Sequence, residues 1–252
     1  MKPQAVLLLV WMAWAGPAMA QRTDADPMLD AGRINVRLGL EYMRQGQLAI
    51  AREKIERALQ QNPHDVGVQV GAGMLYEQMQ DPRKAERHYR QALRLESDNP
   101  EAQNSFGAFL CRSGQAKRGE ELFLAAARNP LYRTPEVAYT NAGVCARGAG
   151  RLEKSEEYLR LALAQRSVYT EALLQLAGVS FERGNLLQAR AFLQRYLAVG
   201  NSAADVLMLG YQVETALADT AAADEYAMRL RTKFPDSPEA RTLAELQRLG
   251  SE

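Results

Sequence analysis

The stretch LGLEYMRQGQLAIAREKIERALQQNP, residues 38–63, has the pattern of two helices joined by a tight turn. Gly39 and Ala51 are small residues that allow two antiparallel helices to approach each other closely. Gly46 stands between them, where a turn requires a positive φ. Pro63 ends the second helix because proline cannot continue the helical hydrogen bonding. The stretch therefore predicts a helix–turn–helix unit.

The small residues of this unit recur along the whole chain. Glycines at the close-contact position are 34 residues apart in the first three units and 36 apart at the next. A period of 34 with small residues at these places is the signature of the tetratricopeptide repeat. The close-contact series comprises Gly39, Gly73, Gly107 and Gly143, with Ala177 in the fifth unit, and the turn series comprises Gly46, Gly114, Gly150 and Gly184, with Leu217 expected at the sixth turn.

The register predicts an all-α fold, a superhelical tetratricopeptide solenoid over residues 32–250. A final helix over 238–249 is expected to cap the last apolar face, as the ends of solenoids require. The alternative is an irregular helical bundle without regular stacking. The six expected units are 32–65, 66–99, 100–135, 136–169, 170–202 and 203–236.

Residues 1–20, MKPQAVLLLVWMAWAGPAMA, have the order of features of a signal peptide. A lysine precedes an apolar run that is too short to span a bilayer comfortably, and the small residues of Ala18-Met19-Ala20 follow. We therefore expect export to the periplasm and cleavage after Ala20, with residues 21–31 as a flexible polar leader. The alternative is a buried N-terminal helix.

The charge of the chain is balanced, with 31 Lys and Arg residues against 30 Asp and Glu residues. A balanced charge gives no electrostatic reason to expect a nucleic-acid partner.

Two cysteines, Cys111 and Cys145, fall near the ends of the first helices of the third and fourth units. Neighbouring helices pack closely enough for side chains that point across the interface to form a disulfide. Because an oxidising compartment favours such bonds, export makes a Cys111–Cys145 disulfide the expectation. The alternative is a pair of buried thiols.

No pattern of catalytic or metal-binding residues stands out. The two histidines, His64 and His88, lie in different units, without carboxylate or thiol ligands at the spacing of a metal site. The glycines follow the repeat period and form no phosphate-binding loop. The expectation is a protein without enzymatic activity, cofactor or small-molecule substrate.

The first helix of each unit is expected to line the concave surface of the solenoid. In the first two units the positions left over from the core are unusually apolar, with arginines beside them, which is typical of a groove for a segment of another protein. The alternative is that residues 21–31 or neighbouring units cover this strip. The predicted groove residues are Arg33, Val36, Leu40, Met43, Val70, Met74 and Glu77.

The segments NPLYRTPEVAYTNAGVC, residues 129–145, and GVSFERGNLLQARAFLQRYL, residues 178–197, resemble the PilF/PilW family of type IV pilus biogenesis proteins. The resemblance implies a pilotin, a protein that helps the outer-membrane secretin to reach its membrane and form its ring. Family members are typically lipoproteins, but this sequence has no cysteine directly after the signal segment. The resemblance implies a periplasmic, outer-membrane-associated partner of the secretin. Without that cysteine, either the true start lies elsewhere, or the protein is a soluble periplasmic chaperone or is anchored by its partner. The alternative role is a general scaffold for another envelope assembly.

Overall fold

A computed structural model describes residues 27–199 and 202–249, and the predicted signal peptide lies outside them. The described residues form thirteen α-helices and no strand, which confirms the all-α repeat fold. The helices are α1 (Pro27–Arg44), α2 (Leu48–Gln61), α3 (Val66–Gln78), α4 (Pro82–Leu95), α5 (Pro100–Arg112), α6 (Ala116–Arg128), α7 (Pro135–Gly148), α8 (Leu152–Gln165), α9 (Thr170–Glu182), α10 (Leu186–Val199), α11 (Ala204–Ala216), α12 (Thr220–Lys233) and α13 (Pro238–Leu249).

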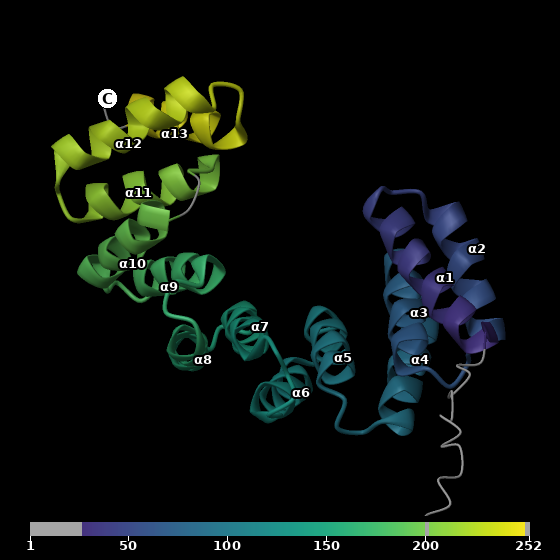
Figure 1. Ribbon diagram of the computed structural model, residues 1–252. Coiled ribbons are helices and arrows are strands. Elements are labelled where there is room, and N and C mark those ends of the chain that lie inside the picture. The colour runs from purple at the N-terminus through teal and green to yellow at the C-terminus, as the bar shows by residue number, and fades with distance from the viewer. Residues whose placement is uncertain (1–26, 200–201, 250–252) are drawn as a thin grey trace, which may run out of the picture.

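The first twelve helices pair into six antiparallel hairpins, and α13 packs against α11 and α12 at the end of the stack, as the predicted capping helix. Figure 1 shows the hairpins following an open arc, with α5, α7 and α9 toward its inside and α6, α8 and α10 toward its outside. The first helices thus form the concave wall. Within the described residues no helix has both the length and the apolar character that a membrane crossing needs.

The predicted leader was wrong for residues 27–31, which form the first turns of α1; residues 21–26 lie outside the described residues. Proline is favoured at the first helical position, where its missing N–H costs no hydrogen bond, and Pro27 takes this position. The early turns of α1 also contact the end of α2, because the Asn62 side chain donates a hydrogen bond to the Leu29 carbonyl at 3.4 Å.

Small residues set the distance between the helices of each hairpin. A Cβ atom on Gly143 would lie 2.6 Å from the Leu159 side chain, and one on Gly210 would lie 2.4 Å from the Tyr226 ring. Both distances are too short for real carbon atoms, so the two helices can pack at this separation only around glycine.

The tight turn after each first helix uses a residue with positive φ. Four turns place glycine there, at φ values of 73° to 77°, as predicted. The second and sixth turns adopt the same conformation at Gln80 and Ala218, with φ near 60°. The expectation that Leu217 occupies the sixth turn position was therefore wrong by one residue. The four glycines are Gly46, Gly114, Gly150 and Gly184.

Candidate functional site

A hollow of about 480 Å³ opens on the concave wall between α1 and α3. Leu40 and Arg44 are four residues apart on α1, and Met74 and Gln78 are four apart on α3, so each pair lies on one helical face. Met74 keeps 40% of its surface exposed, and Leu40 is half-buried. The hollow is lined by Leu40, Met43, Arg44, Met74 and Gln78.

The sequence of α3 explains why an apolar side chain is left in the open. This helix packs against α1, α2, α4 and α5, and most of its residues are therefore buried. Met74 lies on the narrow part of α3 that faces the concave space. A flexible thioether side chain at such a place adapts to irregular apolar partners.

The prediction that Val36 lines the groove was wrong. Val36 is only 6% exposed, because its side chain fills the space beside Gly71 on α3, where a Cβ would lie 2.4 Å from it. Met43 also lies in the apolar core shared by the first two hairpins, so only a small part of it reaches the hollow. Both residues were expected to be exposed, and both join α1 to its neighbours instead.

Two further predicted groove residues lie away from the hollow. Val70 is half-buried and packs against the apolar core between the second and third hairpins. Arg33 is exposed, and its Nε lies 2.8 Å from a carboxylate oxygen of Asp65, the residue that caps α3. Although burial acts in the opposite direction, hydrogen bonds from Arg33 and the Val68 amide lower the pKa of Asp65.

Glu77 joins the second hairpin to the third. One of its carboxylate oxygens lies 2.6 Å from Nε of Arg112 on α5, and the other accepts a hydrogen bond from the Tyr89 hydroxyl at 3.2 Å. Burial, together with the charge of Glu77, raises the pKa of Tyr89. Since Arg112 is 35 residues away in the chain, the pattern of a single unit carries no signal for this contact.

Beyond the hollow, polar side chains connect the helices of the concave wall. The Asn141 amide on α7 donates to the Asn104 amide oxygen on α5 at 3.0 Å. Arg147 on α7 donates to Gln175 at 2.8 Å and to Glu182 at 3.0 Å, both on α9. These contacts join consecutive first helices. Val144 on α7 is 42% exposed beside the disulfide, so this part of the wall combines polar and apolar side chains.

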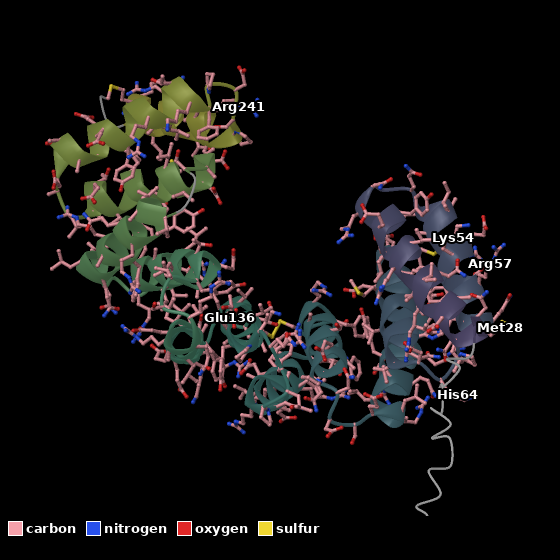
Figure 2. All side chains as sticks on the ribbon, viewed as in Figure 1. Met28, Lys54, Arg57, His64, Glu136 and Arg241 are labelled. Atoms are coloured by element: carbon pink, nitrogen blue, oxygen red, sulfur yellow. A yellow bond between two sulfur atoms is a disulfide. The ribbon has the colours of Figure 1, made fainter. Side chains whose placement is uncertain are left out.

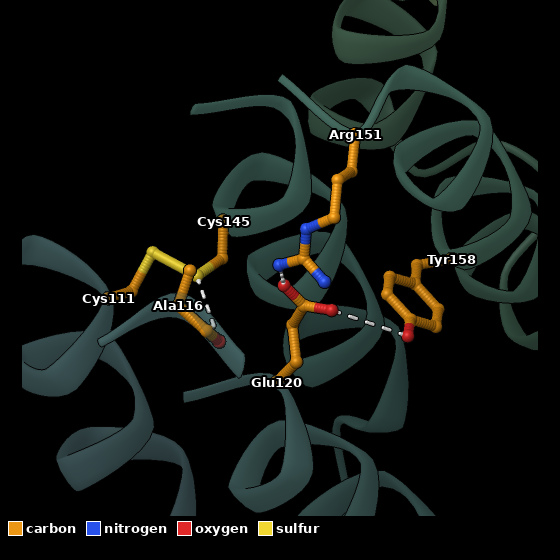
Figure 3. The surroundings of a disulfide bond; sticks show 6 residues. All are labelled: Cys111, Ala116, Glu120, Cys145, Arg151 and Tyr158. Atoms are coloured by element: carbon orange, nitrogen blue, oxygen red, sulfur yellow. Dashed lines mark hydrogen bonds and ion pairs between the residues drawn. A yellow bond between two sulfur atoms is a disulfide. The ribbon is translucent and has the colours of Figure 1, made fainter. Parts of the chain in front are cut away.

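In the structure Cys111 on α5 and Cys145 on α7 are paired as a disulfide, with their Cα atoms 5.8 Å apart (Figure 3). The geometry brings the two residues together as the register indicated. Oxidation of the pair in the cell stays a prediction.

A buried carboxylate lies close to the disulfide. Glu120 on α6 forms an ion pair with Arg151, at the start of α8, and accepts a hydrogen bond from the Tyr158 hydroxyl at 3.4 Å (Figure 3). Since the pairing leaves no unpaired buried charge, this cluster ties the third hairpin to the fourth.

Within the described part of the chain, neither histidine lies in a cluster of possible metal ligands or catalytic groups. His64 is exposed beyond the end of α2. His88 stacks on Tyr76 with ring centroids 5.3 Å apart, and its Nδ1 lies 2.8 Å from the Gln69 amide oxygen. Burial and nearby cationic side chains lower the pKa of His88. Over residues 27–199 and 202–249, no group of three or more His, Cys, Asp or Glu residues is arranged to hold a metal ion.

Comparison with known proteins agrees with this architecture. Residues 42–104 match the tetratricopeptide repeat. The chain is 23% identical over 222 residues to the type IV pilus assembly protein PilF of Pseudomonas aeruginosa, covering 86% of this chain and 88% of PilF. The crystal structure of PilW, described as a widely conserved type IV pilus biogenesis factor, superposes with a TM-score of 0.78 at 32% identity, covering 84% of this chain and 98% of PilW. The structure of Pseudomonas aeruginosa PilF superposes with a TM-score of 0.74 at 22% identity, covering 88% and 98%.

Proposed function

The chain belongs to the PilF/PilW family of tetratricopeptide proteins of type IV pilus biogenesis, and we propose that it acts there as a non-enzymatic adaptor that promotes assembly of the outer-membrane secretin. We propose that it works in the periplasm, at the outer membrane, and binds its partner through the concave wall. Membrane delivery would then depend on the partner.

The observation that supports this proposal is the hollow between α1 and α3. Leu40 and Met74 present apolar surface in a concave place, and Arg37, exposed one turn before Leu40, has no carboxylate partner among the described residues. An apolar floor beside a cation suits an apolar side chain followed or preceded by an acidic residue. We therefore propose an amphipathic or extended segment of the secretin as the occupant.

A complementation experiment tests the proposal. A strain that lacks the gene is expected to lose secretin multimers on gels and twitching motility, and the wild-type gene to restore both. Leu40→Glu and Met74→Glu are expected to restore neither, because a carboxylate on the floor of the hollow repels an apolar or acidic segment. Leu161→Glu on α8 is the control, since Leu161 is similarly exposed on the outer row of helices.

The outcomes separate the role from the site. Normal secretin multimers and motility in the deletion strain would reject the secretin role and favour a general envelope scaffold. A deletion phenotype that both groove variants repair as well as the control would keep the role but reject the hollow as its site.

A further inference from the structure

Two neighbouring loops between hairpins hold aliphatic side chains in solvent. Leu131 lies in the loop 129–134 between α6 and α7 and is 81% exposed. Val168 lies in the loop 166–169 between α8 and α9 and is 56% exposed. We call these two loops, together with Arg128 and Arg195 beside them, the loop edge. The packing of the solenoid core does not explain either exposed side chain.

The first of these loops is braced from several sides. The Asn129 carboxamide oxygen accepts a hydrogen bond from the Leu131 amide at 2.9 Å, and its nitrogen donates to the Asp98 carbonyl at 2.8 Å. Tyr132 packs on an apolar cluster of alanines between α6 and α7. Because both ends of the loop are fixed, Leu131 is held outward in a defined position.

The two loops lie next to each other on one edge of the solenoid. Arg166 of the second loop lies 3.7 Å from Glu136, the second residue of α7, which Figure 2 shows in the middle of the arc. Tyr139 of α7 packs on the apolar clusters beneath both loops. Arg195 of α10 donates to the Ser167 carbonyl at 2.8 Å, so it stands beside the second loop. The aliphatic tips and arginines therefore form one continuous surface.

Two arginines of this edge, Arg128 and Arg133, are available for anions. Among the described residues, Arg128 and Arg133 have no carboxylate within ion-pair distance, in contrast to most arginines that lie between hairpins. Arg195 is already engaged, because it donates to the Ser167 carbonyl and lies over the Phe192 ring.

Carboxylates also lie nearby: Asp98 is exposed and lines the same hollow as Arg128 and Leu131, and Glu136 pairs with Arg166. Glu101 and Glu171 are in the first turns of α5 and α9, where the helix N-terminus balances their charge. Arg128 and Arg133 thus supply unpaired cationic groups beside Leu131.

We propose that the loop edge docks on an anionic phospholipid surface, with Leu131 and Val168 entering the interfacial layer and Arg128 and Arg133 binding lipid phosphates. A guanidinium binds phosphate through paired hydrogen bonds, and cationic residues beside inserted apolar ones are the chemistry of interfacial membrane binding. A lipid bilayer is fluid and can accommodate the projecting Leu131 and Val168 side chains, whereas a folded protein partner would need a pocket of matching shape. The loop edge lies outside the concave wall, so the proposal is independent of the groove.

Vesicle sedimentation tests the proposal with the purified protein. The protein is expected to bind vesicles of phosphatidylethanolamine with phosphatidylglycerol, and this binding should weaken as the salt concentration is raised. It should not bind vesicles of phosphatidylcholine alone. Arg128→Glu combined with Arg133→Glu should lower the partition coefficient about 30-fold or more, from roughly fivefold per arginine. Leu40→Glu should bind like the wild type, which separates this surface from the groove.

A fluorescence reporter locates the contact, with circular dichroism to establish that each variant is folded. Leu131→Trp should shift its emission to the blue with anionic vesicles, relative to the unmodified chain. The control is Leu187→Trp at the opposite edge, where Leu187 is 70% exposed but the nearby Arg183 and Arg190 are paired with carboxylates.

Three results would overturn the proposal. These are equal binding to both kinds of vesicle, unchanged binding by the double arginine variant, or an emission shift at position 187 and none at 131. If the double variant bound vesicles normally but lost a protein partner from envelope extracts, the loop edge would be a protein contact and the lipid assignment wrong.

Discussion

At the scale of single residues, the fold depends on which backbone positions have room for a Cβ atom and which require glycine. Gly143 and Gly148 lie on the same helix, α7, and differ in this respect. A Cβ at Gly143 would collide with Leu159 at 2.6 Å, whereas one at Gly148 would meet nothing within 4 Å. The two positions therefore separate the packing role of glycine from its cost to the helix.

Substituting each glycine by alanine should shift stability in opposite directions. Gly143→Ala should lower the free energy of unfolding by about 1 to 3 kcal/mol, because the new methyl group overpacks the hairpin. Gly148→Ala should raise it by up to about 0.5 kcal/mol, because alanine is the better helix former and Gly148 is the last residue of α7. Urea unfolding followed by circular dichroism measures both changes. Equal shifts of the same sign would show that close approach at Gly143 is not what requires glycine.

The residue scale also shows where sequence reasoning succeeds. The turn glycines could be predicted because a positive φ is a local demand that glycine meets at no steric cost. Gln80 and Ala218 meet the same demand without glycine, since the surrounding hairpin holds the turn in place. Glycine therefore predicted four of the six turns, whereas without a glycine the sixth turn was placed one residue too early, at Leu217.

At the scale of the helix, neighbouring hairpins are joined by contacts that cross the repeat boundary. Cys111 and Cys145 join α5 to α7, and the cluster around Glu120 joins α6 to the start of α8. Both lie at the junction where the loop 129–134 lengthens the connection between the third and fourth hairpins. Extra loop residues weaken the geometric coupling of two units, and cross-links restore it.

The disulfide is expected to form in the cell and to stabilise this junction. Labelling of denatured, unreduced protein should find no free thiol, and reduction should expose both cysteines. Replacing both with serine should cost about 3 to 4 kcal/mol in the chain-entropy account, because the bond closes a long loop in the unfolded chain.

Hydrogen exchange locates this effect within the solenoid. In the double serine variant, exchange should accelerate first in α5, α6 and α7, with the first hairpin little changed, because each hairpin contacts only its neighbours. Labelling of both cysteines in unreduced protein from the cell would contradict the expectation.

The helix scale explains which parts of the candidate site could be predicted. Leu40 and Met74 lie on the concave wall, and their position within one unit decides where they point. Val36 was misplaced because its burial depends on Gly71, a residue of the next unit. The contact between Glu77 and Arg112 was missed for the same reason. Exposure in a solenoid is thus a property of two hairpins, and the period of one hairpin does not report it.

At the scale of the whole molecule, the arc offers two surfaces of different chemistry. The concave wall holds an apolar hollow at the N-terminal hairpins and hydrogen-bonded polar side chains beyond it, whereas the loop edge combines aliphatic tips with the unpaired Arg128 and Arg133. A molecule with these surfaces could hold a polypeptide on its inner wall while its edge rests on a lipid layer. The concave wall carries the central claim, because the proposed role in secretin assembly depends on it.

Site-specific photo-crosslinking in the living cell tests that claim most directly. A benzoylphenylalanine at position 74, on the concave wall, should yield an adduct that contains the secretin, whereas the same group at position 161, on the outer row of helices, should yield none. An adduct of equal yield at both positions, or a secretin adduct at position 161 alone, would contradict the account.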